Sequence, residues 1–142
     1  MALTYIVDTS VVKRLGHAPV RTVVEPLAAA GELARPSICD LEVGCSARNE
    51  KEWDELSAAL DAFDPVDTTA AHVRRALQVQ RLLAQRSQRG RKIPDLLVAA
   101  AAEQLNVAVL HYDAGFDLIA SVTGQRCQWV VPAGTVDRSP DA

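Results

Sequence analysis

The sequence predicts an α/β protein, a three-layer α/β/α sandwich with a mostly parallel sheet of roughly five strands. Short apolar segments rich in β-forming residues alternate with longer segments of helical periodicity. This order is typical of parallel sheets that are covered by helices on both faces. A length of 142 residues suits one globular domain with a sizeable core. We expect residues 1–132 to form that domain and residues 133–142 to be a flexible tail.

Five segments have the composition of strands. The first, Leu3–Val7, is short and apolar, as expected for a strand buried inside a sheet. The third contains Pro65, and because proline cannot donate a hydrogen bond to a neighbouring strand, we expect this strand at an edge. In chain order the expected strands are residues 3–7, 32–37, 63–67, 107–111 and 127–131.

The segments between these strands carry helix signals. Pro19 begins and Gly31 ends one helix, and Ser37 is expected to cap the next. The longest segment has apolar residues along one side, Val73 and Leu77 among them, which predicts an amphipathic helix that buries this side. The expected helices begin near Ser10 and then cover residues 19–31, 38–49, 50–63, 69–86, 93–106 and 114–124.

The composition argues against several classes of protein. The net charge is −3 and the isoelectric point is near 5.6, so any nucleic-acid binding must rest on a local basic patch. Three cysteines without a C-x-x-C pair argue against a disulfide framework and against a cysteine-based zinc site. No basic and apolar leader opens the chain, and its richest apolar run, Leu96–Ala102, is far too short for a membrane span. We therefore expect a cytoplasmic protein.

Two acidic residues follow strands that are expected to be neighbours. Asp8 follows the first strand and Asp113 follows the fourth. In parallel α/β sheets, ligands bind at the carboxyl ends of the strands, at the switch point where the strand order reverses. Each acid also has a plain structural explanation, because Asp8 can cap a helix and Asp113, followed by Ala114 and Gly115, can belong to a turn.

Two further acids lie at the starts of predicted helices on the same side of the sheet. Alone, Glu42 is explained by a solvated helix surface, and Asp95, directly after Pro94, by the helix dipole. Together with Asp8 and Asp113 they offer hard oxygen ligands, which suit Mg²⁺ or Mn²⁺ better than zinc. Since gathered carboxylates repel, we expect at least one raised pKa without metal, and we expect Asp113→Asn to stabilise the metal-free protein.

Four motifs in this order resemble the acidic motifs of the PIN domain, and specifically those of VapC-type toxins. They are YIVDTS with Asp8, DLEVG with Glu42, KIPDLLVAAAA with Asp95 and HYDAGFDLI with Asp113, and the match runs over nearly the whole chain. The resemblance implies a metal-dependent endoribonuclease, the toxin of a toxin–antitoxin pair, in which these four acids hold Mg²⁺ or Mn²⁺ and form the catalytic site. It also implies an RNA substrate, a VapB-type antitoxin as inhibitor, and a homodimer.

The sequence departs from the family pattern at two positions near the last acid. His111 stands where similar proteins commonly have Thr or Ser, and Gly115 stands where many have another Asp. Asp117 is a candidate replacement for that acid. It also lies one helical turn beyond Asp113, which is an ordinary place for a surface carboxylate, and we expect the surface role.

A basic segment precedes the Asp95 helix. Arg89, Arg91 and Lys92 are expected beside the acidic site, where they would offset its charge when RNA approaches. A solvated loop is an equally good explanation. The chemistry that we expect is in-line attack on an RNA phosphodiester by water bound to one or two metal ions, which requires no Ser or Cys nucleophile.

Other functions compete with this hypothesis. A phosphatase of the haloacid dehalogenase type requires a second acid two residues after Asp8, where Ser10 stands. A receiver domain requires an acid pair before the first helix and a lysine at a late strand end, and the sequence has neither pattern. A non-catalytic module that binds RNA or protein through the same fold stays open, and a metal-dependent cleavage assay separates it from the nuclease.

Overall fold

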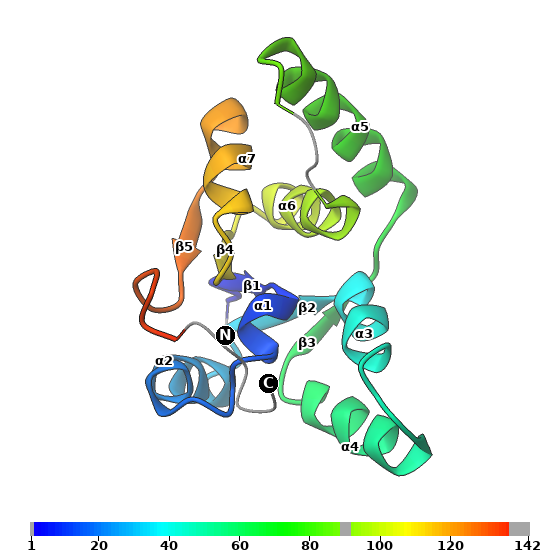
Figure 1. The fold of residues 1–142 in the computed structure, drawn as a ribbon, viewed down its shortest axis with the longest axis vertical. Helices are drawn as coiled ribbons and strands as arrows, with labels where there is room; N and C mark the ends of the chain where they lie inside the picture. Colours follow the sequence, from blue (N-terminus) through cyan, green and yellow to red (C-terminus); the bar gives the residue numbers. More distant parts are fainter. Residues whose placement is uncertain (1, 89–91, 137–142) are drawn as a thin grey trace.

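The computed structural model describes residues 2–88 and 92–136. Its strands form one sheet of order β3-β2-β1-β4-β5, in which each neighbouring pair is parallel. The order reverses between β1 and β4, and the proline-containing β3 lies at an edge, as predicted (Figure 1). The strands are β1 (Tyr5–Val7), β2 (Leu33–Pro36), β3 (Asp64–Val66), β4 (Ala108–His111) and β5 (Cys127–Trp129).

Helices cover both faces of this sheet, which confirms the predicted α/β/α sandwich (Figure 1). Three of them, α5, α6 and α7, pack on one face, whereas α1, α2 and α4 pack on the other, and α3 contributes to both cores. The helices are α1 (Thr9–Val12), α2 (Ala18–Ala29), α3 (Ser37–Gly44), α4 (Glu50–Leu60), α5 (Ala70–Gln85), α6 (Ile93–Leu105) and α7 (Gly115–Thr123).

Successive residues of the two central strands enter different cores. Ile6 and Val109 pack with α5, α6 and α7, whereas Val7 and Leu110 pack with α1, α2 and α4. Successive side chains of a strand point to opposite faces, so β1 and β4 are buried on both sides. This double burial explains why their sequences are continuously apolar.

The buried side of α5 agrees with the prediction only in part. Val73 and Leu77 are 46% and 59% exposed, whereas Leu83, which was also expected on the apolar side, is buried together with Ala76 and Val79. His72 is buried on the same side, and its Nε2 lies 2.5 Å from Oε1 of Gln104 on α6. The helix is therefore amphipathic, with its buried side displaced from Val73 and Leu77 toward Ala76 and Val79.

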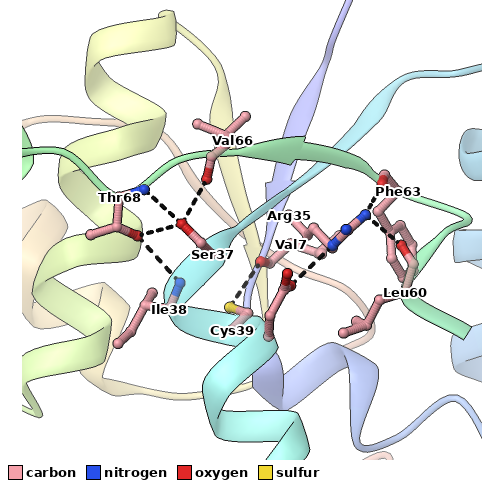
Figure 2. A network of polar contacts seen from close by, with 10 residues as sticks. Val7, Arg35, Ser37, Ile38, Cys39, Leu60, Phe63, Val66 and Thr68 are labelled. Carbon is pink, nitrogen blue, oxygen red and sulfur yellow. Dashed lines mark hydrogen bonds and ion pairs between the residues drawn. The ribbon is translucent and has the colours of Figure 1, made fainter. Parts of the chain in front are cut away.

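The start of α3 also differs from the prediction. Pro36, not Ser37, is the N-cap residue. The Ser37 hydroxyl instead accepts a hydrogen bond from the Thr68 amide at 2.7 Å, and Thr68 Oγ1 accepts one from the Ile38 amide at 3.2 Å (Figure 2). Because β2 and β3 are paired, their carboxyl ends lie side by side and bring these residues together. These two hydrogen bonds attach the start of α3, the helix that carries Glu42, to the segment that follows β3.

Arg35 provides a second attachment for α3. Its Nε donates to Asp40 Oδ1 at 3.0 Å, and its Nη1 donates to the carbonyl oxygens of Leu60 and Phe63 (Figure 2). The guanidinium group of β2 therefore joins the first turn of α3 to the end of α4. Because Arg35 belongs to β2, these contacts fix the position of α3 relative to the sheet.

The end of the described chain packs beside β4. Tyr112 Oη accepts hydrogen bonds from the amides of Gly134 at 2.9 Å and Val136 at 3.1 Å, and Val136 is buried. Residues 137–142, most of the expected flexible tail, lie outside the described residues. None of the helices in the described part of the chain is long and apolar enough to cross a membrane.

Candidate active site at the switch point

Asp8 combines the two roles that the sequence left open. It is the N-cap of α1, and its Oδ2 accepts a hydrogen bond from the Ser10 amide at 3.0 Å. Its Oδ1 is buried without a hydrogen-bond partner among the described residues, and the residue is only 3% exposed. Burial is the main reason why the pKa of Asp8 is raised; the charges of Glu42 and Asp113 also raise it, against the hydrogen bonds from Ser10.

Glu42 reaches the same place from α3. The Thr9 hydroxyl donates a hydrogen bond to Glu42 Oε1 at 2.8 Å, so the carboxylate is held by the residue that follows Asp8. One ligand atom from each of Asp8, Cys39 and Glu42 lies within 4.8 Å of the others. A solvated helix surface therefore does not describe Glu42, which is half-buried and bonded across to α1.

Asp95 lies in the first turn of α6 and is only 6% exposed. Its pKa is raised to about 7, mainly by burial and then by the charges of Asp8, Asp113 and Glu42, with Lys92 acting in the opposite direction. A helix dipole acting alone would lower the pKa of this carboxyl group. The environment of Asp95 is therefore set by burial and by the other acids, which confirms the expectation of a raised pKa.

Asp113 behaves differently from the expectation. Its Oδ1 accepts a hydrogen bond from the Gly115 amide at 2.8 Å, and its Oδ2 lies 3.2 Å from Lys92 Nζ. Burial tends to raise the pKa of Asp113, but these contacts outweigh it and leave the pKa below its usual value. The lowered pKa argues against the expectation that Asp113→Asn would stabilise the metal-free protein, because the partners of Asp113 stabilise its charge.

The two departures from the family pattern have a structural role around Asp113. Gly115 supplies the amide described above, and His111 Nδ1 accepts a hydrogen bond from the Asp113 amide at 3.2 Å. The His111 ring is fully buried, with ring centroids of Phe116 and Trp129 at 4.9 and 5.0 Å. Burial lowers the pKa of His111 to about 4, so the ring is neutral at physiological pH. We infer that the neutral ring helps to hold the backbone at Asp113.

Asp117 bonds to a residue outside the four acids. Both of its carboxylate oxygens accept from Trp129 Nε1 at 3.2 Å, and the residue is exposed. Its charge acts on the pKa values of His111 and Cys127. This position agrees with the expected surface role.

Only part of the expected basic segment can be placed. Arg89 and Arg91 lie outside the described residues. Lys92 directly precedes α6, and its ammonium group is exposed beside Asp113. The charges of Asp113, Asp95 and Asp8 all raise the pKa of Lys92, after the hydrogen bond to Asp113. Lys92 is therefore a cation at the margin of the acidic cluster.

Two residues of the site were missed in the sequence. Thr9 holds Glu42, and Cys39 places its sulfur beside Asp8 and Glu42. Cys39 precedes Glu42 by three positions on one helix, and residues at this spacing share a helix face. That spacing is the signal that could have identified Cys39, whereas the partner of Thr9 lies 33 residues away and has no local signature.

The donor set fits a hard divalent cation. Near the carboxyl ends of β1 and β4, the charges of Asp8, Glu42 and Asp113 all act on Asp95. The buried Asp8 oxygen has no partner within the described chain. Mg²⁺ and Mn²⁺ prefer carboxylate oxygens and retain several waters, which leaves positions for a substrate phosphate. Such an ion would also offset the repulsion that raises the pKa values of Asp8 and Asp95.

An all-parallel sheet with acidic side chains at its switch point defines an α/β protein with an acidic cluster at the carboxyl ends of its strands. The model of the PIN domain family matches residues 5–122. The chain therefore belongs to the PIN domain family, which confirms the resemblance seen in the motifs.

Similar proteins agree with this assignment. The chain is 68% identical over 137 residues to Ribonuclease VapC51 of Mycobacterium tuberculosis, covering 96% of this chain and 100% of that protein. It is 40% identical to Ribonuclease VapC21 of the same species, covering 95% of this chain and 99% of that protein. Among solved structures, VapBC2 from Rickettsia felis bound to a promoter DNA fragment matches with a TM-score of 0.73 at 18% identity, covering 91% of this chain and 99% of that one. At that identity the structural match supports the fold.

Proposed function

We propose that this protein is an endoribonuclease that depends on Mg²⁺ or Mn²⁺ and acts as the toxin of a VapBC-type toxin–antitoxin pair. The observation that carries the proposal is the gathering of Asp8, Glu42, Asp95 and Asp113 at the switch point, with one buried Asp8 oxygen left without a partner. The high identity to a ribonuclease over nearly the whole chain supports the same activity.

The four acids are the proposed metal-binding and catalytic residues. The bound ion would lower the pKa of a coordinated water and stabilise the leaving oxygen of the phosphodiester. Asp8 and Asp95 provide buried carboxyl groups, and Asp95 must give up its proton when a cation binds. Thr9 orients Glu42, and the amides and ring around Asp113 orient that carboxylate.

RNA and an antitoxin are the proposed partners. Lys92 stands at the margin of the acids, and together with Arg89 and Arg91 it is the proposed contact for RNA phosphates. One solved structure of similar fold is a toxin–antitoxin complex from Klebsiella pneumoniae, which supports a VapB-type protein as inhibitor. We propose that its carboxyl-terminal segment presents an Arg or Lys to the acids, because a cation there offsets their repulsion. The proposed setting is a cytoplasmic homodimer, with residues 1–132 forming one domain.

A non-catalytic RNA- or protein-binding module is the alternative. Four carboxylates in a partly buried cluster repel one another and disfavour RNA, which is costly for a module that only binds. The cluster therefore favours the nuclease.

The proposal is tested by RNA cleavage with purified protein in Mg²⁺ or Mn²⁺, with and without a chelator. We expect cleavage that the chelator stops and that Asp8→Asn or Asp95→Asn nearly abolishes, because each variant loses a charged ligand. Asp117→Asn is the matched control, since it makes the same chemical change on an acid outside the cluster, and it should retain cleavage. Full activity in both Asp8→Asn and Asp95→Asn would contradict the site assignment.

A further inference from the structure

A buried thiol forms part of the wall of the acidic site. Cys39 is fully buried in the second position after the start of α3. Its sulfur lies 3.7 Å from the carbonyl oxygen of Val7, the last residue of β1 (Figure 2). The proposed hydrolysis uses no thiol, so this group has no role in the function described above.

The thiol and two carboxylates form a compact donor set. The sulfur of Cys39 and one oxygen from each of Asp8 and Glu42 are mutually within 4.8 Å. Asp8 adds an independent observation, because its Oδ1 is buried, unpartnered among the described residues, and belongs to a residue that is 3% exposed. A buried acceptor without a donor is stabilised when a cation occupies the space beside it.

We propose that Asp8, Cys39 and Glu42 form a second mode of metal binding in this site, selective for thiophilic divalent ions such as Zn²⁺ and Cd²⁺, and that occupancy by such an ion inhibits the nuclease. The inhibitory part of this inference rests on the proposed function. The binding part stands on the donor set alone.

The chemistry of the donors separates this mode from Mg²⁺ binding. Zn²⁺ accepts mixed sulfur and oxygen ligands in tetrahedral sites, whereas Mg²⁺ takes oxygen ligands. Zinc–sulfur and zinc–oxygen bonds of about 2.3 and 2.0 Å bring the ligand atoms to about 3.5 Å from one another. The present separations are up to 4.8 Å, so the ligand atoms must approach one another by as much as about 1.3 Å when the ion binds. A water completes the fourth position.

Binding requires the thiol to lose its proton. A free cysteine is mostly a neutral thiol at physiological pH, and the thiolate is the form that binds metal. When the ion binds, the sulfur–hydrogen bond breaks, a sulfur–metal bond forms, and the proton passes to solvent. Affinity for Zn²⁺ or Cd²⁺ consequently increases with pH.

Inhibition follows from shared ligands. Asp8 and Glu42 belong both to this donor set and to the proposed Mg²⁺ site, so one ion excludes the other. Raising Mg²⁺ should relieve inhibition by Zn²⁺ in a competitive manner.

The test uses Cd²⁺ as the probe, because cadmium–thiolate bonds give an ultraviolet charge-transfer absorption. The full-length protein carries Cys45→Ser and Cys127→Ser, which remove the other two thiols and leave Cys39 alone. We expect the absorption to rise to a plateau at one equivalent of Cd²⁺ and to strengthen with pH. Adding Cys39→Ser, which keeps a hydroxyl near the Val7 carbonyl, should abolish it.

Affinities measured by calorimetry provide the second readout. Cys39→Ser should weaken Cd²⁺ binding by more than the roughly 10- to 100-fold that loss of an outer-shell partner costs, and the ratio of Cd²⁺ to Mg²⁺ affinity should fall accordingly. Equal losses for both ions would overturn the proposal, because they would show a structural role for Cys39. Absence of the charge-transfer absorption in the protein with Cys39 alone would overturn it even if the Cys39→Ser variant fails to fold.

These outcomes are separate from those of the cleavage assay. A cadmium–thiolate absorption without RNA cleavage would leave the metal site intact and contradict the nuclease. RNA cleavage with Mg²⁺ by a protein that shows no cadmium–thiolate absorption would support the nuclease and contradict the thiophilic metal site. Inhibition by Zn²⁺ that Cys39→Ser does not weaken would overturn the inhibitory role of this donor set.

Discussion

Neutralising Asp95 should stabilise the metal-free protein, and the gain should grow with pH. The native state raises the pKa of Asp95 from 3.8 to about 7. Between these values the native protein keeps a proton that the unfolded chain has lost, so native stability falls as pH rises through this window. Asp95→Asn removes the titration, and the variant should therefore exceed wild type most clearly above pH 7.

The size of the effect follows from the two pKa values. At about 1.36 kcal/mol per pH unit, the raised pKa of Asp95 lowers the free energy of unfolding of wild type by about 4 kcal/mol near pH 7. About 2 kcal/mol of this loss arises between pH 5 and pH 7. These are upper values, because water entry and small movements of the carboxylates reduce the repulsion. Asp95 is only 6% exposed, so screening by bulk solvent is limited.

The pH dependence of wild-type stability does not by itself show the contribution of Asp95. The pKa of His111 is lowered to about 4 by burial, so the unfolded chain takes up a proton below about pH 6.5 that the native state refuses. This group makes native stability rise with pH in the window where Asp95 makes it fall. The difference between Asp95→Asn and wild type cancels the His111 contribution, and it is therefore the quantity to measure.

Denaturant unfolding in chelator at pH 5, 6, 7 and 8 gives this difference directly. Asp113→Asn is the contrasting variant: a lowered pKa contributes stability above the unfolded value, so this variant should be less stable than wild type at neutral pH. Mg²⁺ at 100 times its dissociation constant should stabilise wild type by about 2.7 kcal/mol and Asp95→Asn by less. A difference for Asp95→Asn that stays constant or shrinks with pH would refute the reasoning.

Two further predictions concern the residues that surround the acids. Thr9→Val removes the hydroxyl that donates to Glu42, and we expect Mn²⁺ affinity measured by calorimetry to fall roughly 10- to 100-fold. The control is Thr22→Val on α2, whose hydroxyl bonds within its own helix and whose loss should not change Mn²⁺ affinity. An equal loss of affinity in both variants would exclude an orienting role for Thr9. Lys92→Gln should reduce the slope of log RNA affinity against log salt concentration by about 0.7, the value for one phosphate contact on a single strand. Lys51→Gln, at an exposed position on α4, is the control and should leave this slope unchanged. An unchanged slope for Lys92→Gln as well would show that Lys92 does not contact RNA.

The sequence is most informative where one physical requirement dominates. The continuous apolar strands, the edge proline and the acids at strand ends each follow from burial or backbone hydrogen bonding, and the fold agrees with them. On α5 the sequence offers two apolar stripes, and the one with Ala76 and Leu83, beside the contact of His72 with Gln104, is the buried one. Ser37 was misplaced because its partner Thr68 belongs to a different segment of the chain.

The sequence indicated which acids lie near the switch point, and it did not indicate how their charges balance. Asp8 and Asp113 could be identified because each follows a strand, and Asp95 because it lies in the first turn of a helix. Whether a carboxyl group is stabilised or repelled depends on neighbours distant in sequence, such as Lys92 beside Asp113 at 21 residues' separation. The cysteines were considered only as partners of one another, in a disulfide or a C-x-x-C zinc site, so Cys39 was not considered as a ligand beside the acids.

The pairing of β1 with β4 also has a consequence for synthesis of the protein. Tyr5 lies beside Ala108 in the sheet, and Asp8 therefore meets Asp113 only after most of the chain has been made. Contacts between residues so distant in sequence form late, because a long loop must close first. A chain still growing on the ribosome holds its first acid without the last, so the proposed metal site is incomplete until translation has nearly finished. Under the proposed function, this order gives the proposed antitoxin time to be present before cleavage can begin.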